Sequence, residues 1–316
     1  MTQLSFITLD VFTTKPFSGN PLAVVFLPED PTHQLTQRQK HILTLEFNLS
    51  ETIFVHPVTD PKKRTIDIFT IEGELPFAGH PTIGAANWFL CQSPSENGIA
   101  EQVTSLITKS GEIPISIQDA STGTVAAKIA HNTHIHANRY PLSDLLYLHP
   151  TLKPYFPADT TFPLFSIVNG MSQVFIELPT LEALSAVSRA TGGDLVSVTQ
   201  HLDSGWQSGL ICVYFFVRDV DDDVTGKKVI RTRMMLGALE DPATGSSASG
   251  LAAWLALTEG KGGEEIRSYF VQGVEMGRRS DIGVNVKLDG EGGIKEVELT
   301  GSAVRVSEGR IAVPMV

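Results

Sequence analysis

The sequence is poor in cysteine, in charge and in long apolar runs. Its two cysteines, Cys91 and Cys212, have no CxxC or Cys/His spacing near them, which excludes a disulfide framework and a zinc site. We expect both to be buried small hydrophobic side chains. The longest apolar run, "LICVYFFV" at 210–217, is far shorter than the roughly 20 residues of a membrane helix. The first residues lack the basic and apolar regions of a signal peptide, so we expect a cytoplasmic protein without a membrane partner.

Positive charge is also scarce. Charged residues make up 19% of the 316 residues, the net charge is −11, and no run of Lys or Arg forms a basic stripe. Such a chain repels phosphate backbones, so a nucleic-acid partner is not expected. Hydrophobic residues make up 42%, which is enough for a sizeable core, and the length suits two lobes of about 150 residues each.

Most of the chain consists of short β-rich runs separated by Gly, Pro and Asp. Representative runs are "SFITLDVF", "LAVVFL", "ETIFVHP", "TIDIFT", "SQVFIEL", "GVNVKL" and "AVRVS". Helical patterns are fewer, and two are predicted at 36–48 and 180–191, the second beginning with a Thr cap.

One stretch occurs twice. "GELPFAGHPTIGAANWFL" at 73–90 and "LEDPATGSSASGLAAWLA" at 239–256 align at an offset of 166, with six identities in fifteen positions where roughly one is expected. Each copy follows a strand-like segment and opens a helix rich in Ala and Gly, which is apolar on all sides and should be buried.

Duplication of a whole lobe explains this repeat, because the period is much too long for a solenoid. We therefore predict an α+β fold with two pseudo-symmetric lobes, each a β-rich sheet rolled around one buried central helix. The first lobe covers 1–130 and the second 131–299, and a strand at about 300–316 returns to the first lobe.

Small residues precede each repeated helix, so the first backbone N–H groups are left free for an anion. If the lobes face each other across a pseudo-twofold axis, both helix starts converge on a carboxylate-bearing molecule. The repeat differs where chemistry is needed, since His80 matches Ser246 and Asp241 matches Leu75. His80 either exchanges a proton with substrate or caps its helix, and Asp241 is either a working carboxylate or a helix cap.

The sequence does not match the common nucleotide-binding or metal-binding motifs. "GSSASG" has no Lys-Ser/Thr after it, and "GEGGIK" lacks the dinucleotide fingerprint, so no nucleotide cofactor is predicted. "HNTHIHAN" places His131, His134 and His136 close together, but no cysteine and no nearby carboxylate accompanies them. We therefore predict no metal and no cofactor.

Four separated motifs resemble the PhzF family of phenazine-biosynthesis-type isomerases, which share the diaminopimelate epimerase fold. They are "DVFTTKPFSGNPLAVVF" at 10–26, "NLSETIFV" at 48–55, "ELPFAGHPTIGAA" at 74–86 and "EDPATGSSASGL" at 240–251. From the residues alone, Glu51 could be a plain strand-edge carboxylate. The resemblance implies instead that Glu51 is the acid/base residue, with His80 and Asp241 as further catalytic residues. It also implies substrate binding by Gly79, Thr244, Gly245 and Ser246.

The same fold in epimerases uses two cysteines at the helix starts, and this chain has none at 78–82 or 243–248. A single carboxylate favours an allylic isomerisation, as in rearrangement of trans-2,3-dihydro-3-hydroxyanthranilate, and burial should raise the pKa of Glu51 toward neutrality. Two alternatives remain, a non-catalytic binding or scaffold protein and an epimerase or cyclase acting on another small acid. The family resemblance further implies a homodimer.

Overall fold

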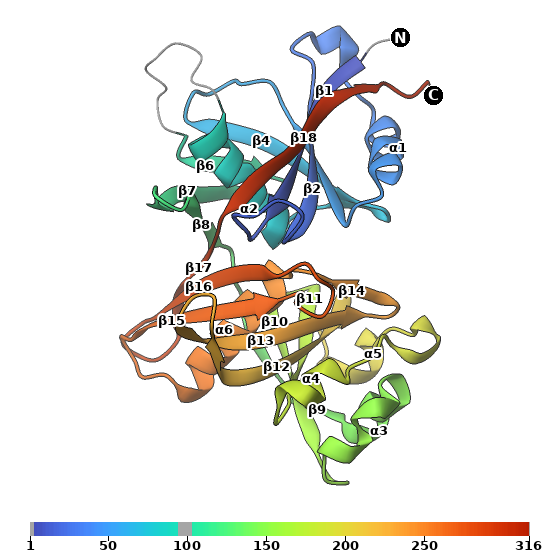
Figure 1. Ribbon diagram of the computed structural model, residues 1–316, viewed down its shortest axis with the longest axis vertical. Coiled ribbons are helices and arrows are strands. Elements are labelled where there is room, and N and C mark those ends of the chain that lie inside the picture. Colours follow the sequence, from blue (N-terminus) through green and yellow to red (C-terminus); the bar gives the residue numbers. More distant parts are fainter. Residues whose placement is uncertain (1–2, 94–102, 316) are drawn as a thin grey trace. The chain divides into compact units, whose positions relative to one another are not determined.

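The computed structural model describes residues 3–93 and 103–315, and the chain divides into two compact units. Unit 1 contains residues 1–128 and 299–316, and unit 2 contains residues 129–298. The boundary near residue 299 falls within strand β17 (Ile294–Gly301). Unit 1 is thus built from both ends of the chain, and both termini lie in it (Figure 1).

Unit 1 is a curved sheet with one long outer helix and one central helix. Its strands are β1 (Gln3–Val11), β2 (Asn20–Phe26), β3 (Glu51–Val55), β4 (Lys63–Thr70), β5 (Gly73–Leu75), β6 (Ser105–Thr108), β7 (Gly111–Asp119), β8 (Thr124–Ile129) and β18 (Ala303–Ala312). Its helical segments are η1 (Pro31–His33), α1 (Gln37–Phe47), α2 (Gly79–Asn87) and the π-helical turn η2 (Trp88–Gln92).

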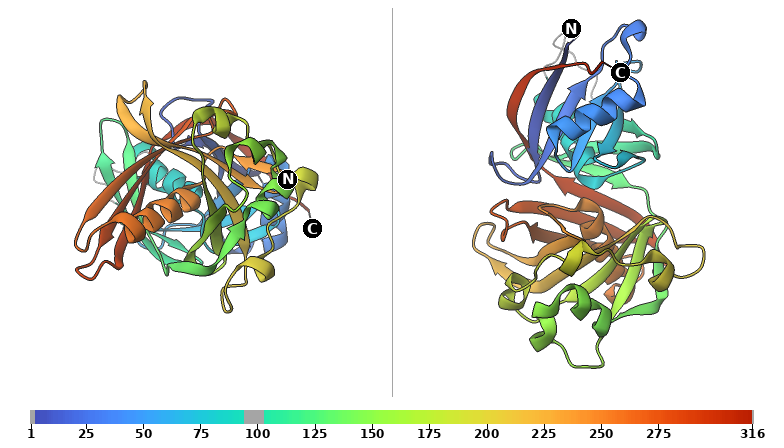
Figure 2. Two further views of the ribbon diagram at one scale, coloured as in Figure 1. Left: turned by 90° about the horizontal axis from the view of Figure 1, so that it is seen from below. Right: turned by 90° about the vertical axis from the view of Figure 1, so that its right-hand side faces the viewer.

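The strands of unit 1 bring distant segments together. β1 lies between β18 and β2 in antiparallel pairs, β2 runs parallel to β3, and β3 is antiparallel to β4. The buried β-branched and aromatic residues of these strands suit a sheet with a covered face. α1 packs on the outside against β3 and β4 (Figure 2), and Thr36 and Gln39 form a capping box at its start.

Unit 2 repeats this plan with more helical segments. Its strands are β9 (His134–Pro141), β10 (Thr161–Val168), β11 (Met171–Glu177), β12 (Leu210–Asp222), β13 (Lys227–Leu236), β14 (Leu239–Asp241), β15 (Glu265–Gln272), β16 (Ser280–Leu288) and most of β17. Its helical segments are α3 (Leu142–Leu148), η3 (Pro150–Tyr155), α4 (Leu181–Ser185), η4 (Thr191–Gly193), α5 (Val198–His201) and α6 (Gly245–Glu259).

The strand pairing of unit 2 matches that of unit 1. β11 runs parallel to β12, β12 is antiparallel to β13, and β13 pairs antiparallel with β14 and parallel with β15, as β4 does with β5 and β6. α6 packs against β10, β11, β15 and β16, whereas α4 contacts β12 and β13 and the short α3 and α5 contact β9 (Figure 1).

The two repeated helices are the central ones, as predicted. Every residue of α2 is buried, and it lies so close to β2 that a Cβ on Gly84 would stand 2.5 Å from Leu22 Cδ2. α6 is buried over most of its first three turns and less so toward its end. These helices need small residues because larger ones would push them off the sheet.

Of the two predicted outer helices, one is confirmed and the other is shorter than predicted. The helix expected at 36–48 is α1, and its Thr cap is Thr36. The helix expected at 180–191 has its predicted Thr180 cap, but α4 ends after five residues at Ser185. The chain after α4 turns back to the sheet, where the N–H of Ala190 donates to the carbonyl of Gly237 at the end of β13.

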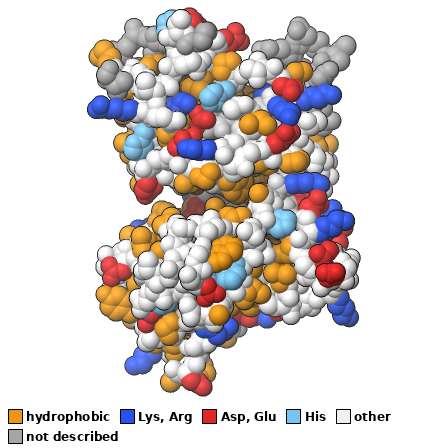
Figure 3. Space-filling view, turned by 180° about the vertical axis from the view of Figure 1, so that it is seen from behind, with side chains coloured by type: hydrophobic (Ala, Val, Ile, Leu, Met, Phe, Trp, Pro, Cys, Tyr) orange, Lys and Arg blue, Asp and Glu red, His pale blue; other side chains and the backbone are white. Residues whose placement is uncertain are grey.

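The prediction that both cysteines are buried is wrong for Cys91. It is exposed, because it lies in η2 after the buried part of the helix has ended, and Cys212 in β12 is partly buried. No helix among residues 3–93 and 103–315 is long and apolar enough to cross a membrane. On the face drawn in Figure 3, Lys and Arg side chains are interspersed with Asp and Glu.

Candidate active site

Glu51 and His80 meet in unit 1. Glu51 is the first residue of β3, and His80 is the second residue of the central helix α2. Glu51 Oε2 lies 3.1 Å from His80 Nδ1, and their side chains are 17% and 3% exposed. A carboxylate and an imidazole in contact, with only the carboxylate reaching the surface, form a pair suited to proton transfer. The resemblance and the repeat each singled out one member, and the structure places the two together.

The prediction of a raised pKa for Glu51 is wrong in direction. Burial by itself raises the pKa of Glu51, but the charge of His80, its hydrogen bond and the hydroxyl of Ser50 outweigh burial, so that the pKa is lowered from 4.5. The prediction took account of the burial of Glu51 but not of its contact with His80. Glu51 is therefore an ionised carboxylate at neutral pH.

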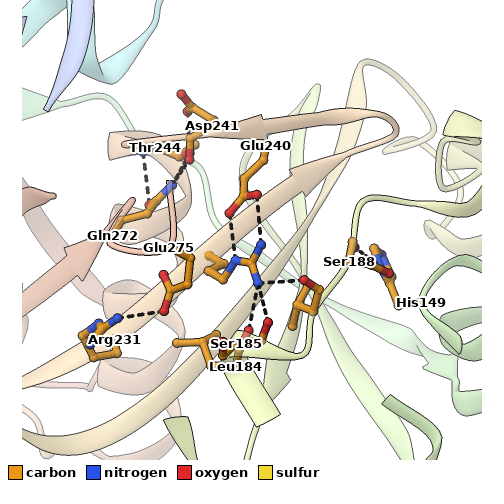
Figure 4. A network of polar contacts seen from close by, with 12 residues as sticks. His149, Leu184, Ser185, Ser188, Arg231, Glu240, Asp241, Thr244, Gln272 and Glu275 are labelled. Atoms are coloured by element: carbon orange, nitrogen blue, oxygen red, sulfur yellow. Dashed lines mark hydrogen bonds and ion pairs between the residues drawn. The ribbon is translucent and has the colours of Figure 1, made fainter. Parts of the chain in front are cut away.

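Asp241 and Thr244 meet in unit 2, at the entrance to α6 (Figure 4). Thr244 Oγ1 donates to Asp241 Oδ2 at 2.6 Å. The fully buried Gln272 holds this loop, since its Nε2 donates to the Asp241 carbonyl at 2.7 Å and its Oε1 accepts from the Thr244 N–H at 3.2 Å. The hydroxyl of Tyr214 also donates to Gln272 Oε1, at 3.2 Å. Sequence reasoning missed Gln272, because no pattern links it to a loop about 30 residues earlier.

Arg233 fixes the strand that carries Asp241. Its Nε and Nη2 bind both carboxylate oxygens of Glu240 at 2.8 and 2.9 Å, and its Nη1 donates to the carbonyls of Leu184 and Val187 at 3.0 and 2.7 Å (Figure 4). The ends of this ion pair are 8% and 9% exposed. These bonds of Arg233 connect β14 to the end of α4 and so restrain Asp241, which follows Glu240.

The starts of α2 and α6 are alike. Their N-caps, Ala78 and Thr244, lie in the described part of the chain and make no side-chain capping bond. Gly79 and Gly245 open the helices and are buried, and Ser246 is partly buried. Neither first turn contains an acidic residue, and the carboxylates at the two helix starts come from outside the helices, Glu51 at α2 and Asp241 at α6.

The expectation that no carboxylate accompanies the histidines is wrong. Asp203 joins His134 and His136 from a distant segment, and their potential ligand atoms all lie within 4.8 Å of one another. Those atoms already bind within the protein. Asp203 Oδ2 lies 2.8 Å from His134 Nε2, while His136 accepts the Asp203 N–H at Nδ1 and contacts Ser166 Oγ at Nε2. His131 contacts backbone carbonyls instead. The cluster therefore acts as a hydrogen-bond network between β9 and the chain after α5.

Comparisons with known proteins identify the family of this chain. The PhzC-PhzF family, described as phenazine biosynthesis-like protein, matches residues 9–309. An uncharacterized isomerase of Mesorhizobium japonicum is 30% identical over 98% of this chain and 99% of its own. The trans-2,3-dihydro-3-hydroxyanthranilate isomerase of Pseudomonas aeruginosa is 30% identical over 96% of this chain and 98% of its own.

Among solved structures, a Bacillus anthracis phenazine biosynthesis protein of the PhzF family superposes with a TM-score of 0.75 and 21% identity, over 99% of this chain and 100% of its own. At that identity the likeness concerns the fold alone, and it confirms the predicted α+β fold class.

Proposed function

Since the chain belongs to the PhzC-PhzF family and is an isomerase of small molecules, we propose that it moves a proton within an unsaturated amino- or hydroxy-carboxylic acid, with Glu51 as acid and base. The Pseudomonas aeruginosa relative carries trans-2,3-dihydro-3-hydroxyanthranilate in its name. That compound is the first substrate to test.

The contact between Glu51 and His80 carries this proposal. The ionised and mostly buried carboxylate of Glu51 takes a proton from an activated carbon, and the electron pair of the broken C–H bond moves into the neighbouring unsaturated system. Protonated Glu51 then gives the same proton to another carbon of the molecule, so that the product is an isomer and the carboxylate is restored. Loss of the negative charge on Glu51 removes its attraction to His80, which drives return of the proton.

We assign His80 and Asp241 to hydrogen bonds with the polar substituents of the substrate, as further catalytic residues. Gly79, Thr244, Gly245 and Ser246 are proposed to bind substrate through the helix starts, where backbone N–H groups and the helix dipole favour a carboxylate. The absence of side-chain caps at Ala78 and Thr244, both described residues, supports this assignment.

We further propose that catalysis needs no cofactor, that the protein is cytoplasmic and that it acts as a homodimer. The first of these follows from the chemistry, since abstraction and return of one proton require only an acid/base group. The dimer rests on the family resemblance, and sedimentation of the purified protein tests it.

Proton NMR in deuterated buffer tests the function. The wild type is expected to convert trans-2,3-dihydro-3-hydroxyanthranilate, whereas Glu51→Gln, which keeps the shape of the side chain, should lose turnover and remain folded. Glu46→Gln is the matched control because Glu46 is exposed on α1. An active Glu51→Gln protein would falsify the assignment of the base. A folded wild type without turnover would rule out this substrate.

A further inference from the structure

The loop between β1 and β2, residues 12–19, contains two aromatic residues with strained backbones. Phe12 and Phe17 have φ angles of 62° and 66°, in the left-handed region that bulky side chains rarely adopt. Such a conformation destabilises the fold unless other contacts compensate for it. Only two other non-glycine residues in the described part of the chain have positive φ, and these are Asn48 and Asp219, whose short polar side chains tolerate it.

The strain at Phe12 has a structural explanation. Its ring is fully buried, and a Cβ on Gly301 would lie 2.4 Å from Phe12 Cδ1 and 3.2 Å from Ile83 Cγ2 of α2. The N–H of Phe12 also donates to the carbonyl of Ser302 at 2.7 Å. Phe12 therefore packs where the end of β17 meets the central helix, and burial of its ring offsets the strain of its backbone.

Phe17 has no such compensation from burial. It is 75% exposed, so its ring gains little from the hydrophobic effect. Its backbone is nevertheless held in place, because the N–H of Phe17 donates to Asp10 Oδ2 at 2.6 Å and Asp10 is only 3% exposed. Glycine or asparagine would adopt this conformation with less strain, so the stability of the fold does not explain a phenylalanine at this position.

This loop lies at the edge of the sheet where Glu51 is found. β2 begins at Asn20, directly after the loop, and two residues further along it Leu22 pairs with Glu51 of β3. Ser50 Oγ donates to Asn20 Oδ1 at 3.2 Å, which connects the end of the loop to the residue before Glu51. Phe17 precedes Asn20 by three residues, so the Cα atoms of these two lie within about 11 Å of each other. An exposed aromatic ring therefore lies close to the proposed base, within the same unit.

We propose that Phe17 is a substrate-contact residue whose ring packs against a flat, unsaturated ring of the substrate at Glu51. Offset stacking of two flat groups would bury the exposed ring of Phe17 and favour a cyclic substrate over an open-chain one. Strained residues cluster at active sites, where the strain holds a side chain in the position that the ligand requires. The inference rests on the proposed function and deepens it, because it selects cyclic compounds among the unsaturated acids.

Phe17→Asn tests this contact, because asparagine tolerates the left-handed backbone and has no aromatic ring. Without ligand, Phe17→Asn is expected to melt at or above the temperature of the wild type. With trans-2,3-dihydro-3-hydroxyanthranilate in the NMR assay, its KM should rise about tenfold with a smaller change in kcat, since the lost contact serves binding rather than proton transfer. Phe17→Tyr keeps the ring and should keep KM close to that of the wild type.

Val58→Asn is the matched control. Val58 is 59% exposed in unit 1, and it follows the end of β3 that is opposite to Glu51. This variant also replaces an exposed apolar side chain by an amide, and it should leave both KM and the melting temperature close to those of the wild type. An equal rise of KM in Val58→Asn and Phe17→Asn would overturn the contact, because the effect would then not depend on the position of the ring.

The outcomes separate this inference from the proposed function. If the wild type converts the compound and KM is unchanged in Phe17→Asn, the contact is overturned while the reaction stands. Unchanged KM together with a smaller species in sedimentation also overturns it, because the ring then belongs to a contact between two copies of the chain. A Phe17→Asn protein that melts below the wild type overturns it as well, because the ring then stabilises the fold.

If the wild type shows no turnover, the proposed reaction of this compound fails, and the contact is judged by binding of the same compound in a thermal-shift assay. Binding to the wild type that is lost in Phe17→Asn and kept in Val58→Asn supports the contact. Equal binding to the wild type and Phe17→Asn, or no binding to either protein, overturns it.

Discussion

Removal of Arg233 should destabilise unit 2 strongly. Arg233→Met leaves the carboxylate of Glu240 buried without its partner, and it removes the donor from the carbonyls of Leu184 and Val187. Breaking a buried ion pair in this way costs about 3–5 kcal/mol of unfolding free energy. Because two carbonyls also lose their donor, we expect a loss of about 4 kcal/mol. With a urea m-value of about 2 kcal/mol/M, a loss of about 4 kcal/mol lowers the unfolding midpoint by about 2 M.

Tryptophan fluorescence during urea unfolding measures this effect. Trp206 and Trp254 lie in unit 2 and Trp88 lies in unit 1, so a Trp88→Phe background reports unit 2 alone. The double variant Arg233→Met/Glu240→Leu should recover part of the stability, because it leaves no unpaired charge. A loss below about 1 kcal/mol in Arg233→Met would show that water reaches Glu240 and that the bonds of Arg233 do not restrain β14.

Two further predictions concern unit 1. Thr36→Ala should destabilise the protein by about 1 kcal/mol, since it removes the side-chain half of the capping box with Gln39; unchanged urea unfolding in unit 1 would contradict the role of the cap. The lowered pKa of Glu51 means that the unfolded chain binds more protons between the folded pKa and 4.5, so the stabilising contribution of Glu51 is complete above 4.5 and is lost as the pH falls through the folded pKa. The wild type should therefore lose unfolding free energy relative to Glu51→Gln as the pH falls below 4.5. A difference in unfolding free energy that does not change with pH would refute the pairing with His80.

The sequence predicted many of the strands and both central helices because their signals are local. Alternating or continuous apolar runs mark strands such as β1, β2 and β12, and small residues mark α2 and α6. The extent of α4 was overestimated because its end is set by tertiary contacts, in which Arg233 takes the carbonyls that a longer helix would have used.

The candidate site was predictable only in part. His80 and Asp241 stand out in a comparison of the two copies, whereas Glu51 was found through the family resemblance. Gln272 and Asp203 reach their partners only through the folding of distant segments, and composition and spacing carry no signal for such contacts.

The discontinuous make-up of unit 1 sets the order in which a nascent chain can fold. β18 covers the edge of β1 over its whole length from Gln3 to Val11, yet β18 is synthesised only after the whole of unit 2. At a synthesis rate of about 5–20 residues per second, the edge of β1 stays unpaired for roughly 15–60 s, by which time unit 2 is fully synthesised. An uncovered strand edge invites pairing with another chain. Nonsense mutations and truncations that stop the chain before β18 should therefore produce aggregation during synthesis rather than a folded enzyme.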